Sequence, residues 1–419
     1  MSCRFLAAVT VVAGLALATA PAIAQQPHPG GPESKAAPTL PPPPPSGPES
    51  HALPTPPPPP SGPGVLGETP LSVDAMVAGV NSRLDDAVGY AYTIARNGQV
   101  VAEAGVGQAR RAVDGTRAFT PTTRLEVMSV TKNMTAIALL KLLQAEAVSI
   151  DSPIARWLPL DWPKAGGFKR ASQTPITFRH LLTHTSGVNQ AIVAAPPGSG
   201  VGNSWSGLRA LVALGATPNP APSNYKNANY ALMRVLIPRL TGQRVVTEQR
   251  AYKRYLLWLN EAVFEPSGVG SVSCWESDDS NAALTYNIAD PAAAGWLVER
   301  EGAERVHCGG HTGLHLSSRD LARVLVHLRH TTALLPADAR AAMFADRLGW
   351  NEGSNNGDGR TDTLNVWWHG GDGDFNGGRE IHTCVMALPQ GYEAALVVNS
   401  QPGGACGVLL DSYKEAAAG

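Results

Sequence analysis

Two β-hairpins at opposite ends of the chain constrain its fold more than any other feature. The first, "YAYTIARNGQVVAEAGVG" (residues 90–107), alternates around Asn97-Gly98, a dipeptide typical of tight hairpin turns. The second, "IHTCVMALPQGYEAALVVNS" (residues 381–400), turns at Pro389-Gln390-Gly391. Helical periodicity over residues 72–88 and 404–417 flanks these strands. We therefore predict an α/β fold, with an antiparallel β-sheet built from both ends, flanked by helices, and a helical second region near residues 155–300.

The first 66 residues differ in character from the rest. Residues 1–24 have the pattern of a secretory signal peptide, with Arg4 before a short apolar stretch and a cleavage motif at 22–24. Residues 25–66 hold a near repeat around two proline blocks, which predicts an extended, disordered linker. The folded domain then covers residues 67–419. No cysteine stands directly after the cleavage motif, where Gln25-Gln26 follow, and no later stretch is apolar enough for a membrane span. We therefore expect an exported protein, periplasmic or secreted, without a membrane anchor.

Charge and cysteine content narrow the partners and the compartment. A formal net charge of −1 over 419 residues argues against nucleic acid or an anionic membrane surface as partner. Four cysteines remain after cleavage, and this even number suggests two disulfides with three possible connectivities, or else four buried thiols. Cys384 lies in the penultimate strand and Cys406 just before a helix that must pack on that sheet. We therefore predict Cys384–Cys406 and Cys274–Cys308.

A serine and a lysine, Ser129 and Lys132, lie three residues apart before the apolar stretch "MTAIALLKLLQAEA" (134–147). Residues i and i+3 share a face of a helix, so the hydroxyl and the amine would be neighbours. An ordinary helix start, with a capping serine and a solvated lysine, is the alternative. The nearly unbroken hydrophobicity favours a buried helix that holds both groups rigidly. Burial can lower the lysine pKa from about 10.4 towards 7, where the amine can activate a serine.

Two further motifs follow in order. "SNYKNANYALMRVL" (223–236) contains Tyr225 and Asn227, and "NVWWHGGDGDFNGG" (365–378) contains His369 followed by two glycines before an apparent strand. With Ser-x-x-Lys, Tyr-x-Asn and His-x-Gly in this order, the chain resembles the serine β-lactamase and penicillin-binding-protein superfamily. It is similar in particular to the branch of class C β-lactamases, D-alanyl-D-alanine carboxypeptidases and esterases. The resemblance extends over about residues 70–410 and implies an acyl-enzyme hydrolase with this superfamily's fold.

The resemblance assigns catalysis to Ser129 as the acylated nucleophile, Lys132 as its hydrogen-bonding partner and Tyr225 as general base or acid coupled to Lys132. It assigns substrate binding to five further residues: Asn227, His369, Gly370, Gly371 and Asp372. The Asn227 amide would bind the substrate's amide group, and the backbone N–H groups of Ser129 and Asp372 would form an oxyanion hole. No cofactor or metal is implied. We expect a monomer whose substrate is a small molecule or a peptide, including one derived from the cell wall.

The third motif departs from the β-lactamase pattern. β-Lactamases have Lys-Thr-Gly, whereas His369-Gly370-Gly371 lacks the hydroxyl and the permanent charge that hold the antibiotic's carboxylate. We therefore predict an esterase or D-amino-acid peptidase, with a class C-type β-lactamase as the alternative. A penicillin-sensing or cell-wall-binding module that acylates without turnover is a third hypothesis, from another class of function. Lys226, inside the second motif, either adds charge near Tyr225 or points outward.

The stretch "HCGGHTGLH" (307–315) suggests a competing hypothesis, a zinc site. It contains four residues of types that bind zinc: His307, Cys308, His311 and His315. Ser317 and Asp320 directly after it have the spacing of a helix cap, and no H-E-x-x-H motif lies nearby, so we favour a structural role. His180 and His184, four residues apart, are likewise predicted to be structural. No G-x-S-x-G motif of an α/β-hydrolase occurs.

Overall fold

The computed structural model describes residues 71–188, 202–219, 225–274, 282–296, 308–351, 360–361, 365–375, 377–400 and 404–418. These residues all belong to one compact unit, Thr55–Gly419. The predicted signal peptide (1–24) and proline-rich linker (25–66) lie outside the described residues.

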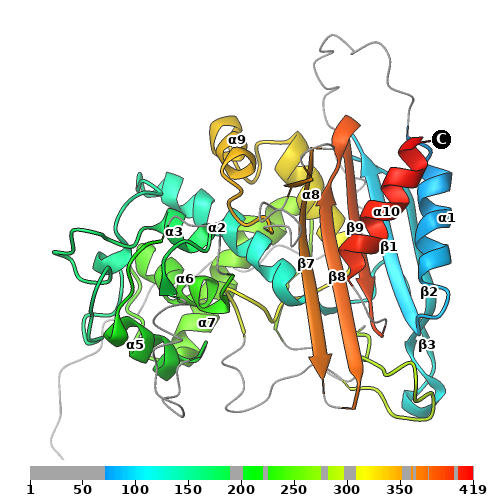
Figure 1. Cartoon of the computed structure of the whole chain (residues 1–419), viewed down its shortest axis with the longest axis horizontal. Coiled ribbons are helices and arrows are strands. Elements are labelled where there is room, and N and C mark those ends of the chain that lie inside the picture. Colours follow the sequence, from blue (N-terminus) through cyan, green and yellow to red (C-terminus); the bar gives the residue numbers. More distant parts are fainter. Residues whose placement is uncertain are drawn as a thin grey trace, which may run out of the picture. The chain divides into compact units, whose positions relative to one another are not determined.

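Among the described residues, seven strands form one antiparallel sheet in the order β3-β2-β1-β9-β8-β7-β6 (Figure 1). β1 lies between its hairpin partner β2 and the last strand, β9, and Tyr90 of β1 is paired with Val398 of β9. The two ends of the chain therefore meet in the middle of the sheet, which confirms the predicted architecture. The strand bounds are β1 Gly89–Arg96, β2 Gln99–Arg110, β3 Arg117–Ala118, β6 Arg360–Thr361, β7 Val366–Phe375, β8 Arg379–Ala387 and β9 Tyr392–Val398. A separate pair joins β4 (Leu125–Glu126) to β5 (His315–Leu316).

Both predicted hairpins are confirmed. Asn97 and Gly98 have φ values of 49° and 84°, the positive values that a two-residue turn matching the strand twist requires. The second hairpin joins β8 to β9 through Pro389–Gly391, where Gln390 and Gly391 also have positive φ. Local sequence chemistry at these two turns therefore accounts for the pairing of β1 with β2 and of β8 with β9.

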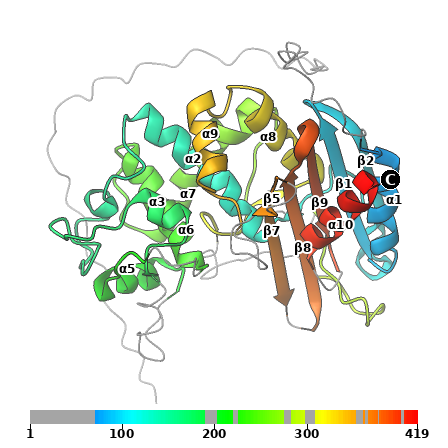
Figure 2. The same cartoon turned by 45° about the horizontal axis from the view of Figure 1, so that its top comes forward.

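The helices divide between the two faces of the sheet and a mainly helical region (Figures 1 and 2). α1 and α10, from opposite ends of the chain, pack on one face, and α8 packs on the other. α3, α5, α6 and α7 form the helical region, with α2 packed against α6 and α7. The helix bounds are α1 Val73–Arg83, α2 Thr131–Ala145, α3 Phe178–Leu182, α5 Trp205–Leu214, α6 Asn227–Leu240, α7 Glu248–Leu259, α8 Ser318–His330, α9 Ala337–Ala345 and α10 Ala405–Ala418.

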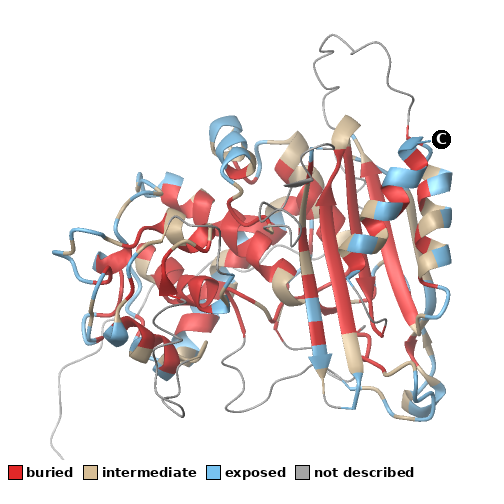
Figure 3. Ribbon diagram, in the orientation of Figure 1, coloured by how far each residue is buried: buried red, intermediate tan, exposed pale blue. Residues whose placement is uncertain are grey.

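α2 is the central helix of the fold. Twelve of its fifteen residues are buried, among them Lys132 and Asn133 (Figure 3). Its apolar side chains join the large hydrophobic core that also contains side chains of α6, α8 and the inner face of the sheet. The prediction of a helix covered on several sides is confirmed, and Ser129 and Lys132 at its start are fixed by that burial.

Two boundaries differ from the predicted ones. Ser129 lies in a single 3₁₀ turn, Met128–Val130, that precedes α2 rather than at the first position of the α-helix itself. His369 was expected before a strand but lies inside β7, which begins at Val366. Pairing with β8 extends β7 through the two glycines, because ladder hydrogen bonds outweigh the low strand propensity of glycine.

Both predicted disulfides are formed. Cys274 bonds to Cys308 and Cys384 bonds to Cys406, with Cα–Cα distances of 5.6 and 5.1 Å. The second bond ties the start of α10 to β8, as expected from their positions in the chain. No helix among the described residues is long and apolar enough to cross a membrane.

Candidate active site

Ser129 and Lys132 are in direct contact at the start of α2. The Nζ atom of Lys132 lies 2.8 Å from the Oγ atom of Ser129 and donates a second 2.8 Å hydrogen bond to the carbonyl oxygen of His311. Lys132 is 0% exposed, and this burial lowers its pKa well below the ordinary value. A neutral amine in this position can accept the proton of the serine hydroxyl.

Met128, the residue before Ser129, has a φ of 48°. Non-glycine residues adopt such values infrequently, and they do so where surrounding contacts fix the backbone. Thr383 supplies one of those contacts, since its hydroxyl donates to the carbonyl oxygen of Val127 at 2.8 Å. This hydrogen bond from β8 helps to fix the backbone of the turn that carries the Ser129 hydroxyl.

Tyr225 lies directly over the amine. The Nζ atom of Lys132 is 4.8 Å from the centroid of the Tyr225 ring, and the Tyr225 hydroxyl hydrogen-bonds with Ser129. Although 38% of Tyr225 is exposed, desolvation of its hydroxyl end raises the pKa, and the hydrogen bond with Ser129 opposes that rise. The phenol thus retains its proton at neutral pH while the neighbouring lysine loses its own more easily.

The His184 ring packs against the Tyr225 ring. The two rings stack with centroids 4.5 Å apart, and His184 Nδ1 lies 3.2 Å from the backbone N–H of Lys226, which donates to it. Nδ2 of Asn229 lies 3.1 Å from the same nitrogen. Burial, followed by the charge of Lys132, lowers the pKa of His184 well below its ordinary range, so the ring accepts these hydrogen bonds as a neutral group. The predicted structural role of His184 is therefore the positioning of the turn before α6.

Asn227 and Lys226 follow Tyr225 at the start of α6. Asn227 is the first residue of α6 and is exposed, two residues after Tyr225. Lys226 precedes it with an extended backbone and a partly exposed side chain. The structure brings the Tyr225 ring to the amine of Lys132, whereas Asn227 lies at the rim.

The third motif runs along β7 beside the serine turn. His369 is 2% exposed, and its Nδ1 atom lies 2.8 Å from the carbonyl oxygen of Gly370. Burial, and then the charge of Lys132, lowers the pKa of His369 to about 3, so the imidazole is neutral at physiological pH. A Cβ atom on Gly371 would lie 2.4 Å from the Val127 carbonyl oxygen, which shows how closely β7 approaches the segment leading to Ser129.

The alternate residues of β7 face the other side of the sheet. A Cβ atom on Gly370 would lie 3.5 Å from the sulfur of Cys406, and the Asp372 carboxylate lies 2.7 Å from Nδ1 of His382. Nε2 of His382 lies 3.1 Å from Glu380. Of the third motif, His369 and Gly371 therefore face the serine. Asp372 can contribute there only through its backbone.

The stretch 307–315, which suggested a zinc site, does not bring its candidate ligands together among the described residues. Cys308 is bonded to Cys274, so its sulfur is not available to a metal, and His307 lies outside the described residues. Within the described ranges, no group of three or more His, Cys, Asp or Glu residues is placed to hold a metal ion. The Ser317–Asp320 cap is confirmed as a capping box at the start of α8. The contact that sequence reasoning missed is the His311 carbonyl on Lys132, because backbone acceptors leave no residue-type signal.

Comparison with known proteins gives the same family. The Beta-lactamase family profile matches residues 78–418. The esterase EstB of Burkholderia gladioli is 24% identical over 68% of this chain and 78% of its own length. A putative penicillin-binding protein, PbpX of Bacillus subtilis (strain 168), is 28% identical over 49% of this chain and 44% of its own length.

Among solved structures, EstCE1, described as a hydrolase with promiscuous acyltransferase activity, superposes with a TM-score of 0.60. The match covers 83% of this chain and all of that one at 19% identity, and it shows a shared fold. The resemblance found in the three ordered motifs is confirmed by the profile, which spans the sheet and the helical region alike. The chain belongs to the Beta-lactamase family.

Proposed function

We propose that this chain is a serine hydrolase that acts through a covalent acyl-enzyme on an ester or amide, of the esterase or D-amino-acid peptidase type. The observation that carries the proposal is the fully buried amine of Lys132, 2.8 Å from the hydroxyl oxygen of Ser129. A lysine held without solvent beside a serine is a base whose lowered pKa suits the activation of that serine.

In the proposed mechanism, Lys132 takes the proton of Ser129 as Oγ attacks the substrate carbonyl carbon. The backbone N–H groups of Ser129 and Asp372 stabilise the negative oxygen of the tetrahedral intermediate. The carbonyl then re-forms, the bond to the leaving group breaks, and Tyr225 passes a proton to that group, drawn in turn from Lys132. Water attacks the acyl-enzyme along the same path and releases the acid.

The third motif supports esters over β-lactams as substrates. His369 is neutral at physiological pH and Gly370 has no side chain, so this part of the site lacks the permanent cation and the hydroxyl that hold an antibiotic's carboxylate. The similarity to the esterase EstB agrees with this choice. Asn227 would bind an amide group at the rim, and the glycines would let the substrate lie along β7.

A class C-type β-lactamase is the second candidate and keeps the same nucleophile. The third, a penicillin-sensing or cell-wall-binding module, is favoured only by the similarity to PbpX, a putative penicillin-binding protein. Slow release of a labelled acyl group without turnover of any ester is the result that distinguishes a sensor from a hydrolase.

The two disulfides fit export to an oxidising compartment, the periplasm or the medium. We propose that residues 1–24 are removed on export and that residues 25–66 serve as a stiff spacer before a monomeric catalytic domain. Cell-wall-derived peptides are then within reach as substrates.

A fluorophosphonate probe followed by intact-mass measurement tests the nucleophile. The wild-type protein should gain one adduct, and Ser129→Ala should gain none. Ser72→Ala, which removes the exposed serine that caps α1, is the control and should label fully. A panel of chromogenic esters, D-alanyl peptides and a cephalosporin then ranks the substrate classes. An adduct on Ser129→Ala would refute the assignment of the nucleophile.

A further inference from the structure

The segment "CGGHTG" (308–313) forms part of the wall around the Lys132 amine. In the described part of the chain, two oxygen atoms receive hydrogen bonds from Nζ of Lys132: Oγ of Ser129 and the carbonyl oxygen of His311, each at 2.8 Å. Since the first oxygen is the proposed nucleophile, the second is the fixed point that orients the amine. The position of this segment therefore matters for the base.

The two glycines of the segment fit it between two helices. A Cβ atom on Gly310 would lie 2.1 Å from the carbonyl oxygen of Tyr230 in α6, and one on Gly309 would lie 2.7 Å from the Tyr255 ring in α7. Both glycines have positive φ, 95° for Gly309 and 81° for Gly310. Only glycine allows a backbone to approach its neighbours this closely in such a conformation. The double glycine of the apparent zinc motif is thus explained by packing.

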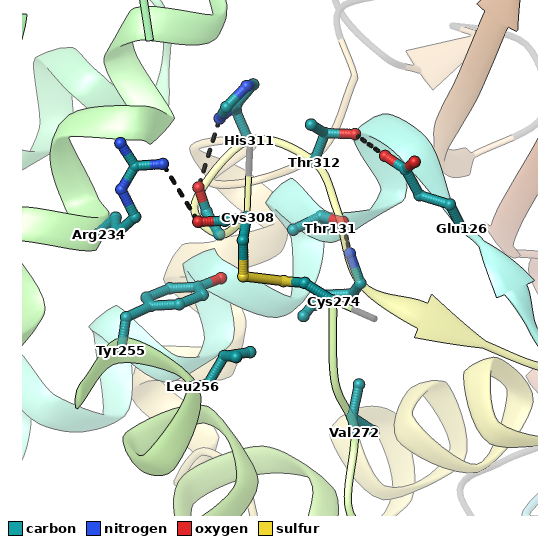
Figure 4. The surroundings of a disulfide bond; sticks show 12 residues. Glu126, Thr131, Arg234, Tyr255, Leu256, Val272, Cys274, Cys308, His311 and Thr312 are labelled. Atoms are coloured by element: carbon teal, nitrogen blue, oxygen red, sulfur yellow. Dashed lines mark hydrogen bonds between the residues drawn. A yellow bond between two sulfur atoms is a disulfide. The ribbon is translucent and has the colours of Figure 1, made fainter. Parts of the chain in front are cut away.

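Four side chains anchor the segment at both ends and in the middle. Figure 4 labels those at the two ends, Cys274, Arg234 and Glu126. Cys308 is bonded to Cys274, and its carbonyl oxygen accepts a 3.1 Å hydrogen bond from Nη1 of Arg234. In the middle, Thr135 of α2 donates to the carbonyl oxygen of Gly310 at 2.8 Å. At the far end, Thr312 donates to Oε1 of Glu126 at 2.7 Å.

Arg234 is the least expected of these groups. It is 0% exposed, in the middle of α6, and a buried guanidinium is costly unless it is paired. Its Nη2 atom donates to Oε1 of Glu248 at 2.6 Å and to the carbonyl oxygen of Asn203 at 2.7 Å. The guanidinium therefore fastens the Cys308 backbone to α6, the helix that follows Tyr225.

We propose that residues 308–312 form a clamp for the Lys132 amine, with Arg234 and the Cys274–Cys308 disulfide as positioning groups that act on catalysis through the His311 carbonyl. The proposal rests on the proposed role of Lys132 as the base. It gives a function in the reaction to a motif whose residue types alone suggested zinc.

Loosening the clamp should change the Lys132 pKa, and with it the pH dependence of kcat/KM, in one direction. If the His311 carbonyl moves, water reaches the amine, burial is lost and the Lys132 pKa rises towards its ordinary value. The pH profile of kcat/KM has an acidic limb whose midpoint reports the pKa of the base in the free enzyme. This limb then shifts to higher pH. Three titratable groups interact with Lys132: Tyr225 before α6, His184 after α3 and His369 on β7. Two more belong to the clamp or bind it, His311 itself and Glu126 on β4.

The test is the pH dependence of kcat and KM for a neutral chromogenic ester. Arg234→Met and the Cys274→Ala/Cys308→Ala pair should shift the acidic limb upward by about one pH unit. At pH values below the pKa of the base, kcat/KM should therefore be roughly tenfold lower than in the wild type. At higher pH it should be close to the wild-type value, and KM should change less than kcat. Arg234→Lys, which keeps a donor for the Cys308 carbonyl, should recover part of the shift.

Each variant has a matched control in the same chain. Arg329→Met removes another guanidinium that donates to backbone carbonyls, those of Tyr392 and Leu388. The Cys384→Ala/Cys406→Ala pair removes the other disulfide. In both controls the acidic limb of kcat/KM should lie at the wild-type pH, even where the substitution lowers the melting temperature. If Arg234→Met does not fold, the near-isosteric Thr312→Val releases the far end of the clamp and should shift the limb in the same direction.

The outcomes separate the clamp from the function on which it rests. An unchanged limb in the clamp variants, or an equal loss of activity at every pH, overturns the clamp while Ser129 and Lys132 remain essential. Activity that survives Lys132→Met would instead overturn the proposed base, whatever the clamp variants do.

Discussion

Gly370 and Gly371 are adjacent in β7 but meet different neighbours. A Cβ atom on Gly371 would lie 2.4 Å from the Val127 carbonyl oxygen and 2.5 Å from Oγ1 of Thr383, whereas the nearest atom to one on Gly370 is Cys406 Sγ at 3.5 Å. β7 thus presses Gly371 against the segment before Ser129 and leaves space beside Gly370.

This difference predicts different effects of the same substitution. Gly371→Ala should lower the free energy of unfolding by about 1 to 3 kcal/mol, because the methyl group overlaps backbone that cannot move without displacing Ser129. Gly370→Ala should stay within about 1 kcal/mol of wild type. Urea denaturation of both variants measures the contrast. Equal destabilisation would contradict the close approach of β7 to Val127.

α2 carries two lysines, Lys132 next to Ser129 and Lys141 away from it, so Lys141 serves as a control for Lys132. Lys132→Met should reduce acylation by a fluorophosphonate about 10²- to 10⁴-fold, the usual contribution of a general base. Lys141 donates to the carbonyl oxygens of Ala262 and Ala333, away from Ser129, so Lys141→Met should acylate at the wild-type rate. Stopped-flow or timed intact-mass labelling measures both rates. Equal rates for the two variants would remove Lys132 from the mechanism.

His369 predicts a dependence of stability on pH. Burial holds its folded-state pKa at about 3, below the unfolded value of about 6.5, so the unfolded chain binds a proton first as the pH falls. The stabilisation is complete above about pH 6.5 and is lost towards pH 3, by about 2 kcal/mol between pH 8 and pH 5. His369→Gln should remove that part of the pH dependence in urea titrations at several pH values. An unchanged slope in the variant would show that His369 does not titrate in this way.

The third motif predicts the order of substrates. Ester turnover should exceed β-lactam turnover by orders of magnitude in the wild-type enzyme. The double variant His369→Lys/Gly370→Thr should raise kcat/KM on a cephalosporin about ten- to a hundredfold, since a charge-assisted hydrogen bond contributes roughly 1.5 to 3 kcal/mol. Gly370→Thr alone, which adds the hydroxyl without the charge, is the control. A wild-type rate near the ceiling of about 10⁸ M⁻¹s⁻¹ on a cephalosporin would contradict the argument.

Features encoded in short stretches of sequence were predictable. Asn97-Gly98 and Pro389–Gly391 specify their turns within a few residues, and the spacing of Ser129 and Lys132 places both groups on one face of a helical turn. The Cys384–Cys406 disulfide followed from the places of these cysteines in a late strand and before the last helix, and Cys274–Cys308 was the remaining pair.

Features that depend on distant backbone were not predictable. The sequence predicts His369 and its two glycines before a strand, whereas pairing of His369 with Val385 of β8 places it inside β7. The contact between Lys132 and the His311 carbonyl spans 179 residues and uses an atom that every residue possesses. Residue type therefore gave no indication of it.

The pairing of β1 with β9 sets the order in which this protein can become active. β1 finds this partner only when residues 392–398 are available, long after β1 itself has been synthesised. Contacts between residues so far apart in sequence form slowly, because a long loop must close before they contribute. β7, which lies beside the Ser129 turn, is separated from β1 by two strands, β9 and β8, and is held in the sheet through them. A chain still being synthesised therefore has no complete wall around Ser129 until β9 is in place.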